Sequence, residues 1–326
     1  MRRSPTRRRG AGTPPAVAAL LRRFGTQRPL RGGSLLISIF GDAIAPRGGA
    51  VTLGSLIRLA APFGLTERLV RTSVARLARE GWLVARRAGR RSEYRLTRGG
   101  TARFAQATRR IYGASPRRWD GHWTLALLTG NARRQARLRE DLRWLGFGQL
   151  TPAVLVHPGC TRAQARAWLR SVPGARGALL LSSSSGKLAA DRALTAHGWD
   201  LAALATRYCV FLAQFSPVAA ALAWRKVPAE TAFVVRTLLI HEYRKIHLQD
   251  PLLPPALLPR KWVGTAAYGL CRRLYARLFA DAEAHLSATA RRLHRSLPPA
   301  NSAAHARFGG IAVHMTKAPR KRASSA

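Results

Sequence analysis

The spacing of apolar residues in the first third of the chain is that of short helices. Residues 34–44 are almost all apolar, which predicts a buried helix, and a second helix is expected to open at Thr52, a favourable N-cap residue. A third helix is predicted over 66–80, after an Ala-Pro-Phe-Gly break. Its apolar stripe consists of Val70, Val74 and Leu77. Helices joined by so tight a turn are typical of a helix-turn-helix.

Two strand-like runs and a further helix follow. The runs are residues 82–85 and 93–96, and the turn between them contains an Ala-Gly pair among arginines. The amphipathic helix after them is predicted to end near Tyr112. The order helix, helix, turn, helix, hairpin, helix predicts a winged helix-turn-helix over 34–113, with the hairpin as the wing.

The helix over 66–80 has a basic face opposite its apolar stripe. Side chains at i, i+3, i+4 spacing make up this face: Arg68, Arg71, Thr72, Arg76 and Arg79. The predicted wing adds Arg86, Arg87, Arg90 and Arg91. Arginine pairs with guanine or with phosphate, and threonine contacts a base or the backbone, so the mixture suits a major groove. A solvated arginine face explains the helix alone, but a basic wing directly after it favours DNA binding over protein docking.

The middle of the chain has the pattern of a small α/β sandwich. An apolar strand begins the region 119–186, and an Arg-rich helix with leucines on one side follows it. Strands are predicted at 153–157 and 177–181, with a helix over 163–172 between them. This order of elements predicts a ferredoxin-like domain, a type of unit that commonly pairs subunits through a strand edge or a helix face.

Helical spacing dominates residues 190–296. One helix is expected after Asp200, a second over 229–247 and a third near 265–284. Prolines in QDPLLPPALLPRKW predict an extended, packed loop between the last two. We therefore expect an α+β protein: a winged helix, a central ferredoxin-like sandwich and a C-terminal helical domain.

Part of the helical region carries groups that suit an anionic ligand with an apolar or aromatic portion. The candidate effector-binding residues are Arg236, His241, Tyr243, Arg244 and Trp262. Cations and aromatic rings around one cavity would bind such a ligand. The alternative is that the helix packs through its apolar stripe, with His241 hydrogen-bonded in the core and the cations in water.

The charge of the chain indicates a polyanionic partner. In 326 residues, 56 Lys and Arg against 14 Asp and Glu give a net charge of +42, and binding to phosphates releases counterions. The bias towards Arg, Ala, Gly and Pro is also typical of a GC-rich genome, which weakens the argument from composition. Residues 1–33 hold nine arginines and no acid. This arm and the tail over 297–326 are predicted to be disordered, either inert or in non-specific contact with DNA.

Enzyme chemistry and metal binding find no support in the sequence. His241-Glu242 resembles the start of a zinc-protease HExxH, but Lys245 stands where the second histidine belongs. We expect no catalytic residues, no metal and no cofactor. Three widely spaced cysteines are typical of buried residues in a reducing cytoplasm. Arg207 and Arg236 interrupt the most apolar stretches before the ~18–20 residues that span a bilayer, so we expect no membrane association.

Several blocks of sequence resemble the phenylacetate-catabolism repressor (PaaX) family. They are GDAIAPRGGAVTLGSLIRLAAPFGLTERLVRTSVARLAREGWL, the wing end YRLT, the junction RRIYGASPRRWDGHWTLALL, and LLIHEYRKIHLQDPLLPPALLPRKW. The resemblance covers residues 34–285. It implies a homodimeric bacterial repressor that binds double-stranded operator DNA and is released by an acyl-CoA effector, phenylacetyl-CoA. His241, Arg244, Asp250 and Trp262 match the family's C-terminal signature.

The sequence therefore predicts a cytoplasmic, DNA-binding transcriptional repressor that is not an enzyme. The helix over 66–80 is the expected recognition helix, and Arg86 to Arg91 form the expected wing. The alternative is an RNA-binding or nucleic-acid-processing protein with a ferredoxin-like domain. Preference for a palindromic duplex over random duplex and single-stranded RNA distinguishes the two.

Overall fold

The structure is a computed structural model that describes residues 13–26, 32–89, 91–113, 118–171 and 178–311. The chain divides into two compact units that do not follow sequence order. The first unit comprises Met1–Gly113, Phe211–Arg244 and Tyr268–Ala326, and the second comprises Ala114–Val210 and Lys245–Ala267. The arm over 1–33, predicted to be disordered, contains a helix whose apolar stripe of Val17, Leu20 and Phe24 is buried. The tail over 297–326, also predicted to be disordered, places Arg307 and Phe308 in the core. The other boundaries of the predicted five-part division stay a prediction.

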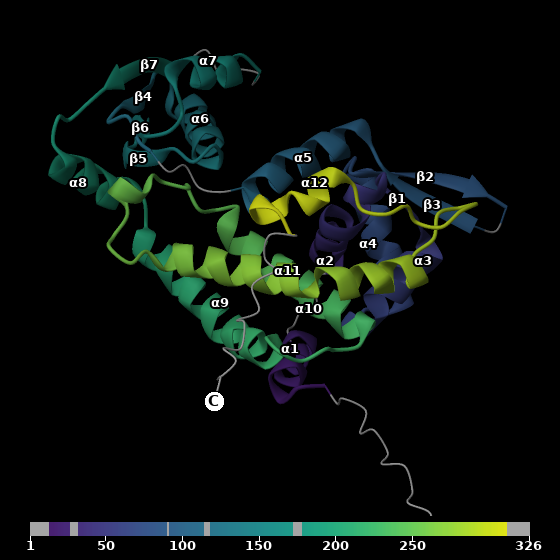
Figure 1. The fold of residues 1–326 in the computed structure, drawn as a ribbon. Coiled ribbons are helices and arrows are strands. Elements are labelled where there is room, and N and C mark those ends of the chain that lie inside the picture. Colours follow the sequence, from purple (N-terminus) through teal and green to yellow (C-terminus); the bar gives the residue numbers. More distant parts are fainter. Residues whose placement is uncertain (1–12, 27–31, 90, 114–117, 172–177, 312–326) are drawn as a thin grey trace, which may run out of the picture. The chain divides into compact units, whose positions relative to one another are not determined.

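The N-terminal part of the first unit is a winged helix (Figure 1). Its elements are α1 (Pro15–Thr26), α2 (Gly32–Ile39), η1 (Phe40–Ile44), η2 (Ala45–Arg47), β1 (Ala50–Thr52), α3 (Leu53–Ala60), η3 (Ala61–Phe63), α4 (Glu67–Arg79), β2 (Leu83–Ala88), β3 (Arg91–Leu96) and α5 (Arg98–Tyr112). The expected helix over 34–44 is thus an α-helix that continues as a π-helical turn.

Local chemistry explains the turn between α3 and α4. The Thr52 side chain caps α3 by accepting from the backbone N–H of Ser55. Gly64 has φ 76°, a left-handed conformation that favours glycine, and it lets the chain reverse. Thr66 then caps α4 in the same way. The apolar stripe of α4 is buried as predicted, at Val70, Val74 and Leu77.

The wing belongs to a three-stranded antiparallel sheet in the order β1-β3-β2. The hairpin of β2 and β3 pairs Leu83 with Leu96 and Ala88 with Arg91, so it is longer than the sequence predicts. The strand β1 is an addition to the prediction. It has only three residues and pairs with a strand more than forty positions away, so its own sequence holds almost no signal.

Three long helices and three short segments complete the described helical part: α9 (Leu201–Leu222), α10 (Ala229–His247), η4 (Pro255–Leu257), α11 (Val263–Thr289), α12 (Ser302–His305) and η5 (Arg307–Gly309). Asp200 caps the start of α9 by accepting from the N–H of Ala203 at 2.9 Å. Within the first unit, Phe211 and Phe215 of α9 and Phe233 of α10 are buried with most of the apolar side chains of α11.

One of these helices departs from the expectation about membrane spans. The helix α9 continues through Arg207 and is long and apolar enough to cross a bilayer, by length and composition only. Arg207 donates to Gln249 at 2.5 Å and to the carbonyl of Lys245 at 2.7 Å, which accommodates its charge within the second unit. The core helix of a soluble protein passes the same test, so this property is weak evidence for a membrane.

The second unit contains the predicted ferredoxin-like sandwich. Its elements are β4 (Trp123–Leu128), α6 (Ala132–Trp144), β5 (Gly148–Thr151), β6 (Val154–His157), α7 (Arg162–Ser171), β7 (Ala178–Ser183) and α8 (Leu188–Gly198). The antiparallel sheet has the order β5-β6-β4-β7. Leu142 of α6 and Ala165 of α7 lie in one cluster with Ala126 and Leu155, so both helices cover the same face. The opposite face carries Trp123.

The strand β5 is an addition to the predicted elements, and Gly148 explains why the sequence does not indicate it. A glycine in the sequence Gly-Phe-Gly looks like the end of a helix. In the structure, a Cβ on Gly148 would lie 2.6 Å from the indole of Trp199, so this strand position requires a residue without a side chain. The fold class is otherwise as predicted.

Candidate DNA-binding surface

The basic side of α4 is exposed. Arg68, Arg71 and Thr72 are all accessible, and Arg71 is 56% exposed. Arg71 pairs with Glu67, one turn earlier, with 2.6 Å between Nη2 and Oε1. Such a surface pair contributes only about 0.3–0.5 kcal/mol, so the guanidinium can exchange this carboxylate for a phosphate or a base edge.

The neighbouring side chains of α4 also have local partners. The Thr72 hydroxyl donates to the carbonyl of Arg68 at 3.0 Å, which leaves its oxygen available as an acceptor. Arg76 lies 3.5 Å from Glu80, and a Cβ on Gly33 would come within 2.1 Å of its Nη2. Arg76 therefore packs against the first turn of α2, and Gly33 makes this close approach possible.

The wing places further arginines beside α4 in the same unit. Arg86, Arg87 and Arg91 are exposed on β2 and β3, whereas Arg90 lies outside the described residues. Arg71 of α4 and Arg91 of the wing line one pocket of about 440 Å³. The structure thus brings the predicted recognition helix and the predicted wing to one surface.

Three of the four predicted effector residues of α10 are buried. Arg236 and Tyr243 are 0% exposed and His241 is 3% exposed, whereas Arg244 is half-buried. Tyr243 packs against Phe211, with 5.6 Å between ring centroids. Trp262 belongs to the second unit, where its ring meets the Tyr208 ring edge-on at 6.2 Å. Three of the five residues therefore lie in the core of the first unit.

Two of these residues join α10 to α2. The Arg244 guanidinium donates to the carbonyl of Ser34 at 2.7 Å and to Oγ of Ser38 at 2.7 Å. Oγ of Ser38 is also 2.9 Å from Nδ1 of His241. Burial lowers the pKa of Arg244. Because α2 packs against α4 through Gly32 and Gly33, these hydrogen bonds place α10 one helix away from α4, the predicted recognition helix.

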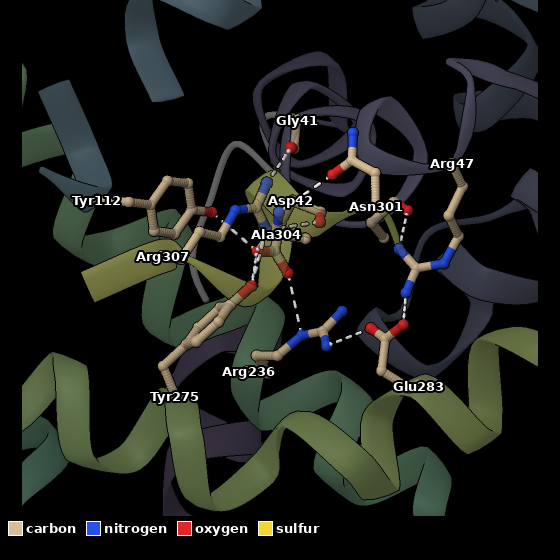
Figure 2. Close-up of polar contacts among 11 residues, drawn as sticks. Gly41, Asp42, Arg47, Tyr112, Arg236, Tyr275, Glu283, Asn301, Ala304 and Arg307 are labelled. Atoms are coloured by element: carbon tan, nitrogen blue, oxygen red, sulfur yellow. Dashed lines mark hydrogen bonds and ion pairs between the residues drawn. The ribbon is translucent and has the colours of Figure 1, made fainter. Parts of the chain in front are cut away.

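A buried carboxylate that sequence reasoning missed lies at the centre of the first unit (Figure 2). Oδ1 of Asp42 accepts hydrogen bonds from Tyr112 at 2.8 Å, Tyr275 at 2.8 Å and Arg307 at 2.9 Å. Its other oxygen is 3.0 Å from Nε of Arg236. One acidic side chain therefore joins η1, α5, α10, α11 and the segment after α12.

A second carboxylate extends this cluster. Glu283 of α11 pairs with Nη1 of Arg236 at 2.8 Å and also with Arg47 of η2. Two carboxylates thus hold three buried guanidinium groups (Figure 2). The sequence offered one signal for this cluster. Asp42 is the only acid in the first 66 residues and stands inside an apolar run, where a charge requires a buried partner.

The electrostatics of the cluster keep Asp42 ionised. Burial alone raises the pKa of this carboxyl, but Arg236, Arg307 and the two tyrosine hydroxyls outweigh burial and lower the pKa below its ordinary value. Burial raises the pKa of Tyr275 to about 12, so this hydroxyl stays a donor. Burial also lowers the pKa of Arg47 to about 10, which leaves it charged at neutral pH.

Among the described residues, no group of three or more His, Cys, Asp or Glu side chains is arranged to hold a metal ion. A pocket of about 590 Å³ in the first unit has a mainly apolar lining that includes Leu96 and Phe104, with Arg95, Arg109 and Arg307 around it. None of the predicted effector residues lines this pocket. It is a second place in which an anionic ligand with an apolar portion would fit.

The fold and this basic surface define a winged-helix transcription regulator with a central ferredoxin-like domain. Three family profiles match in order: PaaX-like protein at residues 31–100, PaaX protein central Cas2-like domain at 116–195, and PaaX-like protein C-terminal domain at 199–288. The chain is 36% identical over 291 residues, 87% of its length, to the transcriptional repressor PaaX of Escherichia coli (strain K12), of which it covers 92%. The chain belongs to the PaaX-like family of transcriptional repressors.

A solved structure is also similar. The uncharacterized protein Rv0674 from Mycobacterium tuberculosis is 24% identical, with a TM-score of 0.49, and the match covers 71% of this chain and 89% of that one. The family assignment rests on the sequence matches. It agrees with the expectation that the chain is not an enzyme, because the E. coli relative is a transcriptional repressor.

The buried cluster leads to a prediction about stability. Replacing Asp42 by asparagine leaves Arg307 buried without its carboxylate and Arg236 with Glu283 alone, which should lower the free energy of unfolding by about 3–5 kcal/mol at pH 7. Because the pKa of Asp42 is lowered by folding, its contribution is present at neutral pH and is lost as the pH falls below about 4. Urea unfolding at pH 7 and in acid measures both effects.

The matched control is Glu67→Gln, which removes an exposed carboxylate from the pair with Arg71. It should change the free energy of unfolding by less than about 1 kcal/mol. Equal losses in the two variants would show that the buried carboxylate has no special role.

Proposed function

We propose that this protein is a cytoplasmic repressor that binds a double-stranded operator through α4 and the wing. The observation that carries the proposal is the pairing of an exposed basic face on α4 with exposed wing arginines in one unit. A helix of thirteen residues with its apolar side buried fits a major groove. Arg68, Arg71, Thr72 and Arg76 would read or position the DNA, and Arg86, Arg87, Arg90 and Arg91 would contact phosphates.

We further propose that an aryl-acyl-CoA, phenylacetyl-CoA by family resemblance, releases the repressor through α10. Arg236 and Arg244 already have protein partners, so a CoA phosphate reaches either cation only by replacing those partners. Loss of the hydrogen bonds from Arg244 to Ser34 and Ser38 would free α2, which packs against α4. An effector acts in this way if it prefers the conformation in which these bonds are broken. His241, Tyr243 and Trp262 are the remaining candidate contacts.

We also propose that the protein acts as a homodimer. One winged helix covers little DNA, and a two-fold dimer would read two half-sites. The first half of α9 supports this proposal. Its exposed positions carry no charge: Ala202, Ala203, Thr206, Cys209 and Val210. An uncharged exposed face in a chain of net charge +42 suits contact with a second copy of itself.

The first prediction from this proposal distinguishes side chains that read bases from side chains that contact phosphates. Operator DNA is obtained by selecting duplexes from a random pool, and binding is measured on the selected palindrome, random duplex and single-stranded RNA. Arg71→Ala or Thr72→Ala should cost about 1–3 kcal/mol on the operator and little on random duplex. Arg91→Ala should weaken both duplexes alike and reduce the salt slope by about one unit.

Arg137→Ala on α6 is the matched control for loss of one exposed positive charge. It should leave binding nearly unchanged. The assignment of α4 to the major groove is wrong if the helix and wing variants show the same uniform loss. Equal affinity for all three nucleic acids would instead favour the RNA-binding alternative.

The second prediction concerns the effector. Aryl-acetyl-CoA should raise the melting temperature and release operator DNA, with stabilisation that grows as RT ln(1 + [L]/Kd). Arg244→Ala should abolish both responses while operator binding persists. Ser38→Ala, which removes a partner of Arg244 but keeps the cation, should keep the thermal shift and alter only release.

Arg109→Ala tests the other pocket, since Arg109 is exposed and lines it. Loss of the thermal shift in this variant, together with a normal shift in Arg244→Ala, would move the effector to that pocket. Loss of DNA binding and ligand response together in Arg244→Ala, with a lower melting temperature, would show that Arg244 is structural.

The third prediction concerns assembly. Light scattering should give the mass of a dimer for the free protein and for its operator complex. Val210→Glu should produce monomers, because it places a charge at the proposed contact. Leu188→Glu on α8 is the control, since Leu188 is similarly exposed, at 45% against 49% for Val210. A monomeric wild-type protein, free and on DNA, would contradict the proposal.

A further inference from the structure

The segment that follows α11 is built onto the winged helix. The N–H of Thr52 donates to the carbonyl of Arg291 at 3.0 Å, and the N–H of Arg291 donates to Oγ of Ser55 at 2.9 Å. The N–H of Leu293 donates to Oε1 of the buried Glu93 at 2.9 Å. Figure 1 shows this segment beside β1 and β3. The segment is therefore fixed against the sheet of the wing.

A short bridge closes the same segment into a hairpin. Arg291 pairs with Ser296, and the N–H of Arg292 donates to the carbonyl of Arg295 at 2.9 Å. Leu293 is buried, whereas Arg291 and Arg295 are exposed. We call residues 290–297 the arginine hairpin. It lies beyond residue 288, where the match to the C-terminal family profile ends.

The hairpin completes the pocket of about 440 Å³ that Arg71 and Arg91 line. Its guanidinium groups come from α3, α4, the wing and the hairpin: Arg58, Arg71, Arg91, Arg291 and Arg292. No carboxylate is among the described residues that line it. Five cations in one small pocket repel one another, so an anion bound there lowers the electrostatic energy.

Within the part of the chain that the structure describes, no acidic side chain forms an ion pair with Arg58 or Arg291. Arg58 donates to Oγ of Ser55 and to the carbonyl of Thr289, both at 3.1 Å. Arg291 donates to the carbonyls of Ser287 and Ala290. These bonds orient the side chains without neutralising them. Arg292 lies 3.8 Å from Glu93, and Arg71 keeps its exposed pair with Glu67.

The start of α3 adds a second attraction for anions. Thr52, Leu53 and Gly54 line the pocket at the N-terminus of this helix, where the helix dipole is positive and the N–H groups of the first turn have no acceptor within the helix ladder. Two N–H groups at this end already have acceptors, that of Thr52 in the carbonyl of Arg291 and that of Ser55 in Oγ1 of Thr52. A Cβ on Gly54 would meet only Arg58, at 3.8 Å, so a ligand can approach this backbone closely. The combination of N–H groups and fixed guanidinium groups is the chemistry that binds phosphate.

We propose that this pocket binds a backbone phosphate of the operator, and that the arginine hairpin thereby forms part of the DNA-binding surface. The inference rests on the proposed function, since the pocket lies between the recognition helix and the wing. That position favours a phosphate of duplex DNA over a free anion. The hairpin acts as an additional clamp on the sugar-phosphate backbone.

The test compares single substitutions on the full chain. Arg58→Ala and Arg291→Ala should each weaken binding to operator and random duplex alike, and each should reduce the slope of log K against log salt by about one unit. Arg291→Lys, which keeps the charge, should retain most of the slope. Arg295→Ala is the matched control, because Arg295 lies on the same hairpin but does not line the pocket. A loss in Arg295→Ala equal to that in Arg291→Ala would overturn the site.

A second measurement changes the DNA and then combines that change with the protein variants. Single phosphates of the operator are replaced by neutral methylphosphonates, and one replacement should weaken the wild-type protein but have no further effect on Arg58→Ala or Arg291→Ala. Additive losses at every phosphate would overturn the proposal. The melting temperature is also measured with inorganic phosphate or CoA. If Arg58→Ala and Arg291→Ala kept their DNA affinity but were no longer stabilised by these anions, the pocket would be a site for a small anion and the proposal would be wrong.

The two hypotheses fail in different ways. If the wild-type chain showed no affinity for duplex DNA, or if Arg71→Ala had no effect, the proposed function itself would fail. If Arg71→Ala behaved as expected while Arg58→Ala and Arg291→Ala bound normally, only the hairpin clamp would fail.

Discussion

The ionised Asp42 carboxylate is the constraint on which the first unit depends. A buried charge of this kind is tolerated only with full compensation, and here two guanidinium groups and two tyrosine hydroxyls provide it. Its partners come from α5, α10, α11 and the segment after α12. The winged helix is therefore not a separate module, because η1, which continues α2, carries a charge that distant parts of the chain must neutralise.

This connection offers a route by which the proposed effector could influence DNA binding. The helix α10 holds η1 through Arg236 and holds α2 through Arg244, and α2 packs against α4 where Arg76 lies over Gly33. A shift of α10 that breaks one of these hydrogen bonds would change the support of α4, the proposed recognition helix, without any contact between effector and DNA. Such coupling requires two arrangements of packed elements with different affinities for the ligand.

Local signals in the sequence predict much of this architecture, and non-local partners explain what they miss. The stripe of Val70, Val74 and Leu77 and the Thr66 cap depend on neighbouring residues, so α4 was predictable. Arg236 and Arg244 were predicted on a helix, but their partners Asp42 and Ser34 lie about two hundred positions away. Periodicity shows that a cation lies on a helix, whereas burial decides what it binds. For the same reason, β1 and the arginine hairpin could not be predicted, because residues far away in the sequence hold both in place.

The positions of the few acidic residues divide the arginines of this chain into those that stabilise the fold and those whose charge remains available for binding. There are 14 Asp and Glu for 56 Lys and Arg, so most cations cannot have an acid of their own. The arginines that lie next to an acid in the fold are the ones that form structural ion pairs. Asp42 and Glu283 hold the core arginines, and Glu93 orders the hairpin through the N–H of Leu293. Around the pocket of the wing, by contrast, serine and carbonyl oxygens orient Arg58 and Arg291 and leave their charge intact. In the proposed site, a phosphate of the DNA backbone would neutralise this charge.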